Sequence, residues 1–163
     1  MKNQNVSVFT GELANFEDDL HIDGNDINQA YCDQPALYAY WATLATKAKN
    51  LYERKKFEVE KQENYIKKTL IGILDSKVRM NLEMDGEKIT ESRVANCIYI
   101  DSEYISAVNE YNLLKEELLD LQSSLSVLEV ARESMNQRKD MLISLGAQLR
   151  QESNNSEVYI KNK

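Results

Sequence analysis

The sequence predicts an all-α protein built on two long amphipathic helices, which pair as an antiparallel hairpin or coiled coil and self-associate. Three observations lead to this prediction. The 163 residues include one proline and five glycines, too few turn residues for a many-stranded sheet. Apolar residues recur at steps of three and four over two long stretches. The length suits one domain, since two ordinary domains need a longer chain.

The first 33 residues form a predicted acidic, flexible arm, in which Lys2 is the one basic residue against seven acids. The segment Phe16–Gly24 mixes acids with spaced apolar residues. One interpretation is a disordered arm that keeps the protein soluble. The other is an acidic peptide that docks on a partner or folds back on the basic helix. After the arm we expect a helical, oligomerising domain over 34–152 and a flexible tail over 153–163.

The first long helix is predicted from about Ala36 to about Met80, a length of ~65 Å at 1.5 Å per residue. Asp33 is the predicted cap, and Pro35 falls in the first turn, where its missing amide costs little. The apolar stripe consists of Leu37, Trp41, Leu44, Ala48, Leu51, Val59, Ile66, Leu70, Ile73 and Leu74. Because Trp41 lies on this stripe, we interpret it as a core anchor in preference to a base-stacking platform.

The connection between the long helices contains Asp85-Gly86, the best turn signal in the chain. Thr90 is predicted to cap a short helix over Glu91–Cys97, followed by an apolar connector, Ile98–Ile100. The second long helix is predicted to begin at Asp101-Ser102-Glu103, where acids meet the positive end of the helix dipole.

The second helix has the clearest periodicity. Its stripe consists of Tyr104, Val108, Tyr111, Leu114, Leu118, Leu121, Leu125, Leu128, Met135, Leu142, Leu145 and Leu149. Two helices alone shield only one side of each stripe, so we expect self-association to cover the remaining apolar surface. The residues expected in the core or the oligomer contact are Leu37, Trp41, Leu44, Leu118, Leu121, Leu125, Leu128 and Leu145.

Residues for catalysis or cofactor binding are missing from the pattern. His21 is the only histidine, the glycines are never clustered, and no zinc spacing exists. We therefore expect no catalytic residues, no metal and no cofactor. Cys32 and Cys97 are predicted to be reduced, buried thiols. No apolar run reaches the ~20 residues of a membrane span, and no signal peptide is evident, which together predict a cytoplasmic protein that binds no membrane.

A basic segment stands out, although the net charge of -7 argues against a simple basic nucleic-acid binder. Ten basic residues against five acids lie in Lys47–Arg79. The candidate contacts to a nucleic acid are Arg54, Lys55, Lys56, Lys61, Tyr65, Lys67 and Lys68, with the residues 54, 61 and 68 aligned on one side of the helix and Tyr65 able to stack on a base. The alternative is a solvated face, paired with neighbouring glutamates or with the acidic stretch Asp101–Asp120.

A family resemblance joins these features. After the acidic arm come Gln34-Pro35-x-Leu37-Tyr38-x-Tyr40, the basic helix, Asp101-x-Glu103-Tyr104, and a helix ending Arg138-Lys139-Asp140-x-Leu142-Ile143-x-Leu145-Gly146-Ala147-x-Leu149-Arg150. Over roughly residues 20–152 this order resembles the phage recombination mediators related to UvsY of T-even phages. The present chain departs from the pattern in its longer acidic arm and more negative net charge.

The resemblance implies a ring-like homo-oligomer that binds single-stranded DNA through the basic long helix, in the cytoplasm of the host cell. It further implies that the protein helps to load a RecA-like recombinase onto DNA covered by single-strand-binding protein. A second hypothesis from another class is a coiled-coil interaction protein, such as an assembly factor or an inhibitor, that binds protein partners only.

Overall fold

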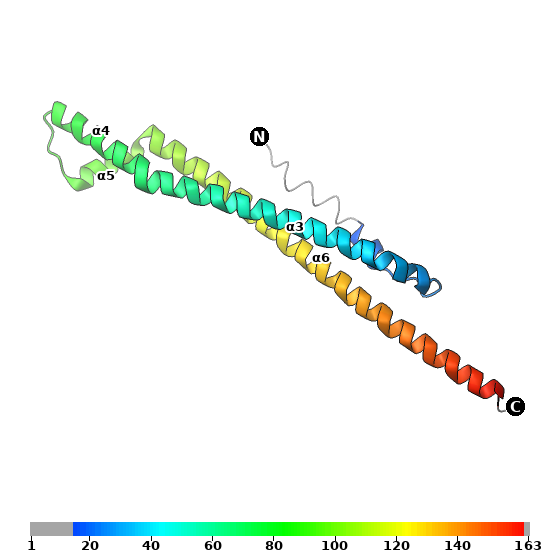
Figure 1. The fold of residues 1–163 in the computed structure, drawn as a ribbon. Coiled ribbons are helices and arrows are strands. Elements are labelled where there is room, and N and C mark those ends of the chain that lie inside the picture. The colour runs from blue at the N-terminus through cyan, green and yellow to red at the C-terminus, as the bar shows by residue number, and fades with distance from the viewer. Residues whose placement is uncertain (1–14, 162–163) are drawn as a thin grey trace. The chain divides into compact units, whose positions relative to one another are not determined.

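The computed structural model describes residues 15–161, with side chains for residues 15–153. Within this range the chain has helices and turns but no strand, which confirms the predicted all-α class. The elements are α2 (Phe16–Leu20), α3 (Ile27–Tyr65), a π-helical turn η1 (Ile66–Leu70), α4 (Ile71–Met84), α5 (Glu91–Ile100) and α6 (Ser102–Lys161) (Figure 1). The first long helix therefore extends from Ile27 to Met84, longer than predicted, with η1 inside it.

The chain divides into two compact units. The first unit comprises Met1–Asn50 and Ser123–Lys163, and the second unit comprises Leu51–Gln122. Each unit contains a part of the first long helix and a part of α6. Within the first unit Tyr31 contacts Leu142 and Gln34 contacts Met135, so the two helical parts of this unit are antiparallel. Within the second unit Lys55 contacts Glu117 and Gln62 contacts Glu110, so its two parts are antiparallel as well.

The start of α3 differs from the prediction. Asp26 is the cap, since its carboxylate accepts a hydrogen bond from the Gln29 amide at 3.1 Å, whereas Asp33 and Pro35 lie inside the helix. A proline within a helix costs ~3 kcal/mol, because it removes one amide donor. Contacts with α6 offset that cost, since Gln34 Nε2 donates to the Met135 carbonyl at 2.6 Å. The prediction used local capping preferences, which these long-range contacts override.

The core of the first unit is formed where α3 and α6 pack together. Trp41, Leu128, Met135 and Leu142 are all completely buried. The other buried residues of this unit are Ala30, Gln34, Leu44, Ala45, Ala48, Ala131 and Arg138, while Leu37, Leu125 and Leu145 are half-buried. The interpretation of Trp41 as a core residue thus agrees with its burial.

Close packing also explains why residue 146 is a glycine. The Tyr31 hydroxyl donates to the Leu142 carbonyl, and a Cβ at residue 146 would lie 2.5 Å from that hydroxyl oxygen. The glycine therefore makes room for a tyrosine from α3. Cys32 points away from this contact and is exposed, so its predicted burial is wrong. It lies nine residues before Trp41, about half a turn around the helix from the buried face.

The core of the second unit is an apolar cluster shared by four elements. The buried members are Ile66, Leu70, Leu74, Val78, Leu82, Val94, Ile98 and Ala107. Cys97, Tyr104, Val108 and Tyr111 pack against this cluster and are partly buried. Both cysteines are free thiols. In this unit Leu121 is buried and Leu118 is half-buried.

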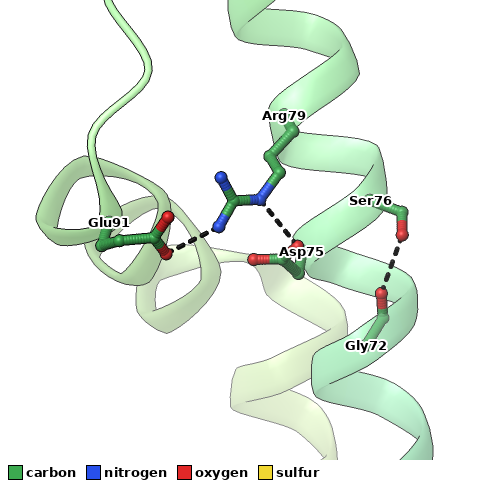
Figure 2. A network of polar contacts seen from close by, with 5 residues as sticks. All are labelled: Gly72, Asp75, Ser76, Arg79 and Glu91. Carbon is green, nitrogen blue, oxygen red and sulfur yellow. Dashed lines mark hydrogen bonds and ion pairs between the residues drawn. The ribbon is translucent and has the colours of Figure 1, made fainter.

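Polar contacts join α4 to the short helix α5. Arg79 lies between two carboxylates, at 2.8 Å from Asp75 on its own helix and 2.6 Å from Glu91 at the start of α5 (Figure 2). The hydrogen bonds to Asp75 and Glu91 raise the pKa of Arg79. A second ion pair joins Arg93 to Glu87 in the connecting turn. These contacts position α5 beside α4, as Figure 1 shows.

The predicted connection is confirmed at its turn and its caps. Gly86 has a φ of 67°, a left-handed conformation that glycine adopts without strain. The Thr90 hydroxyl accepts a hydrogen bond from the Arg93 amide at 3.3 Å, and Asp101 caps α6 through the Glu103 amide at 2.8 Å. The predicted connector Ile98–Ile100 is wrong, because α5 continues through it to bury Ile98 in the core.

Candidate nucleic-acid interface

The predicted DNA contacts all lie in the second unit, on α3 and η1. Four of the six basic residues, Arg54, Lys56, Lys61 and Lys68, are exposed and form no ion pair with a described residue. The other two, Lys55 and Lys67, are engaged with carboxylates. The structure thus separates a set of available cations from a set that already has counterions.

Lys55 is part of the fold of the second unit. Its ammonium lies 2.8 Å from Glu117 on α6 and 2.7 Å from Glu58 one turn further along α3. Burial lowers the pKa of Lys55, but hydrogen bonds to Glu117 and Glu58 outweigh that effect and raise it. A phosphate approaching Lys55 has to compete with both carboxylates. This pairing matches the alternative interpretation, in which acids of Asp101–Asp120 neutralise part of the basic segment.

Lys67 has a weaker, exposed partner. Its ammonium lies 2.5 Å from Glu63 on the preceding turn, and the hydrogen bond that it donates to this carboxylate raises the pKa of Lys67. The same bond lowers the pKa of the Glu63 carboxyl. Exposed pairs of this kind contribute little to stability, so Lys67 remains able to exchange its partner.

The available cations do not share one face. Arg54 and Lys61 are seven residues apart, which places them on the same side of an α-helix. Lys56 follows Arg54 by two residues and points ~200° away from it. Lys68 lies inside η1, where the π-helical turn alters the alignment predicted for an ideal α-helix.

An aromatic residue that the sequence pattern did not reveal lies between Arg54 and Lys61 on the same face of α3. Phe57 is 67% exposed and lies three residues after Arg54 and four before Lys61. Tyr65 is 44% exposed and lies four residues after Lys61. Cations and exposed aromatics therefore alternate along one face of α3. We call Arg54, Phe57, Lys61 and Tyr65 the α3 row. The spacing of Phe57 was the available signal, but an irregular apolar stripe concealed it.

Tyr65 also borders a groove whose opposite side is acidic. Together with Leu70 and Ile73 it lines a groove of about 640 Å³, which α6 closes with Glu103 and Glu110. Gln62 donates to the Glu110 carboxylate at 3.0 Å. These carboxylates repel phosphates, so the tyrosine ring is suited to contact a base and the groove is unsuited to the backbone of a nucleic acid.

The described part of the chain offers neither a metal site nor a membrane-spanning helix. No three histidine, cysteine or carboxylate side chains among these residues are arranged to hold a metal ion. No described helix combines the length and the apolar character needed to cross a membrane.

Comparisons with known proteins do not assign this chain to a family. No protein-family model, no curated protein and no solved structure matches this chain. The resemblance to the phage recombination mediators stays a prediction.

Proposed function

We propose that this chain is a non-enzymatic, self-assembling helical protein that binds single-stranded DNA through α3 and acts as a recombination mediator. In this role it helps to load a RecA-like recombinase onto DNA covered by single-strand-binding protein. The observation that supports DNA binding is the α3 row, in which exposed cations and exposed aromatics alternate. Support for the loading role comes from the family resemblance.

The α3 row suits a single strand better than a duplex. Bases of a single strand are free to stack on aromatic side chains, which contributes ~1–3 kcal/mol per base. Phosphates between those bases attract the guanidinium of Arg54 and the ammonium of Lys61 through counterion release. A row of this kind reads no base sequence, because it offers rings and charges without a fixed set of base-edge hydrogen bonds.

Self-association is supported by a second stripe on α6 within the first unit. Seven positions at alternating steps of three and four carry no charge, and we call them the α6 stripe. They are Val127, Val130, Ser134, Gln137, Met141, Ser144 and Gln148. Val130 is 63% exposed and Met141 is 58% exposed. A helix face that carries no charged residue over three heptads is typical of a helix that packs against another helix.

The mode of assembly follows from the two long helices. We propose that α3 and α6 form one antiparallel hairpin and that hairpins associate through the α6 stripe into a closed oligomer. A closed oligomer repeats the modest α3 row around the particle, and a long strand then contacts several copies at once. Multivalent contact raises the overall affinity without any stronger single contact.

Charge reversal of the α3 row tests the proposal. Arg54→Glu combined with Lys61→Glu should weaken binding of a labelled oligonucleotide at least ~10-fold and lower the salt slope by ~1.4, for two lost phosphate contacts. Phe57→Ala should weaken it with a smaller change in salt slope, because stacking releases no counterion. Fluorescence anisotropy at several salt concentrations measures both quantities.

Lys56→Glu is the matched control, since Lys56 is exposed on the same segment but faces away from the α3 row. It should change binding much less than either Arg54→Glu or Lys61→Glu alone, which change the charge by the same two units. Equal effects of the three reversals would point to net charge alone and would contradict a specific surface.

The second candidate function is a coiled-coil protein that binds protein partners only. The α6 stripe favours it equally, because an uncharged helix face fits any suitable helix. Under this hypothesis the wild-type protein binds no oligonucleotide at low salt, and the same anisotropy experiment distinguishes the two functions.

A further inference from the structure

Residues 15–26, the described end of the acidic arm, belong to the first unit and contact two of its buried side chains. The Phe16 ring packs edge-to-face on the Trp41 indole with centroids 5.0 Å apart. The Asp19 carboxylate accepts a hydrogen bond from the indole nitrogen at 2.9 Å. Two residues further on, the His21 carbonyl accepts one from Arg138 Nη2 at 3.1 Å. Trp41 and Arg138 are thus both contacted by one six-residue segment.

This segment is weakly held. The helix α2 has five residues and buries none of them. A helix this short has no stability of its own, so its attachment depends on the contacts just described and on the partial burial of Leu20 and Ile22. No residue of 15–26 is fully buried, and the segment carries five acids and no lysine or arginine. Local opening of such a segment requires little free energy compared with unfolding of the core.

Arg138 is unusual because it is buried without an anion. Only 5% of its surface is exposed, and its guanidinium donates to the Gln34 side-chain oxygen at 2.5 Å and to the carbonyls of Ala30 and His21. All of these acceptors are neutral, and the Nε atom has no partner. A buried guanidinium is more stable with an anionic acceptor than with neutral oxygens.

The groups that the segment covers match the chemistry of a nucleotide. An indole offers a stacking face to a base, and a guanidinium offers a fork of donors to a phosphate. The segment covers the indole with the Phe16 ring and the Asp19 carboxylate, whereas the guanidinium receives from it only the neutral His21 carbonyl. The anionic acceptor that a phosphate would supply is therefore missing at Arg138. A neighbouring ring, Tyr40, packs edge-to-face on Trp41 with centroids 5.4 Å apart.

We propose that residues 15–26 are a displaceable acidic strap, and that single-stranded DNA competes with this strap for Trp41 and Arg138. The proposal rests on the proposed function and adds its regulation, because it makes the arm a built-in competitor of the ligand. With the strap in place the site in the first unit is closed. A strand that displaces the strap stacks a base on Trp41 and brings a phosphate to Arg138.

The test uses the single tryptophan of the full-length chain as a reporter. Asp19→Ala removes the acceptor of the indole hydrogen bond, and Asp18→Ala is the matched control with the same charge change. We expect acrylamide to quench Trp41 more strongly in Asp19→Ala than in Asp18→Ala. We also expect Asp19→Ala to bind an oligonucleotide at least about threefold more tightly than Asp18→Ala does, a difference that anisotropy resolves. Phe16→Ala should behave like Asp19→Ala, and circular dichroism verifies that each variant keeps its helices.

Four results would overturn the strap. The first is that a saturating oligonucleotide leaves the emission and the quenching of wild-type Trp41 unchanged, while binding still depends on Arg54 and Lys61; the proposed function then stands and the strap fails. The second is equal oligonucleotide affinity of the two aspartate variants. The third is that a peptide of residues 15–26, but no oligonucleotide, changes the Trp41 emission of Asp19→Ala, which makes an acidic peptide the ligand. If neither the wild type nor Asp19→Ala binds an oligonucleotide, the strap and the proposed function both fail.

Discussion

At the scale of single residues, Asp101 both caps α6 and forms an ion pair with α4. Its carboxylate accepts the Glu103 amide at the start of α6 and lies 3.5 Å from Lys77 on α4. The hydrogen bond from the Glu103 amide, followed by the charge of Lys77, lowers the pKa of Asp101. A carboxyl group with a lowered pKa stabilises the fold above its unfolded pKa, and this contribution is lost as the pH falls through the folded value.

Asp101→Ala should therefore be less stable than the wild type at neutral pH. The difference should shrink as the pH falls below about 4, the ordinary pKa of an aspartate, and on through the lower pKa of the folded state. Thermal unfolding of both proteins between neutral and acidic pH measures it. A difference that stays constant over this range would contradict the electrostatic part of the explanation.

Local chemistry explains which residues could be predicted from the sequence. Thr90 and Asp101 act on amides two or three residues away, so their side chains and the chain direction suffice. The roles of Arg138 and Gly146 depend on groups more than a hundred residues away, Ala30 and Tyr31 respectively. Phe57 was missed for another reason, since the apolar stripe is irregular around it and its spacing from Arg54 and Lys61 becomes informative once the buried face of α3 is known.

At the scale of elements, the π-helical turn η1 corrects the direction of the apolar stripe. Buried residues from Ile66 to Leu82 recur at steps of four. Each such step advances the face of an α-helix by ~40°, so four steps would carry the stripe ~160° around the helix. The extra residue in η1 turns Leu70 back towards the core. Periodicity counting detected the stripe but not this insertion, because a step of four is compatible with both helices.

Deleting one residue from η1 should therefore be tolerated. Removing the exposed Thr69 converts the π-helical turn into an α-helical turn and leaves Leu74 and Val78 on the buried side, at a cost of about 1 kcal/mol. Removing the exposed Ser76 from α4 instead rotates Val78 and Leu82 by ~100° and should cost about 3 kcal/mol or more. Denaturant unfolding compares the two variants. A similar loss in both would show that η1 does not absorb a residue.

At the scale of the whole molecule, the proposed function requires two surfaces, the α3 row for DNA and the α6 stripe for assembly. The all-α class followed from composition and period, because few breakers leave few alternatives to long helices. The α6 stripe could not be predicted from composition and period, because only its two valines and one methionine are apolar. Its signal is the exclusion of charge, which becomes visible once the buried face of α6 is known.

The α6 stripe makes a specific prediction about assembly. Val130→Lys places a charge in the stripe and should shift the protein towards the monomer, because burying an unpaired ammonium between helices is costly. Glu129→Lys is the control, since residue 129 is exposed and lies ~100° away from the stripe. Both variants introduce one lysine in the same turn of α6. Equal masses of the two in sedimentation equilibrium would exclude the stripe as the contact.

The native mass of the wild-type protein, measured with and without a single-stranded oligonucleotide, tests the central claim most directly. One chain has a mass of 18.8 kDa. The account predicts a discrete multiple of that mass at micromolar concentration, and a further increase equal to a whole number of oligonucleotides at low salt that is lost at high salt. A monomer whose mass the oligonucleotide does not change would contradict both the assembly and the DNA-binding function.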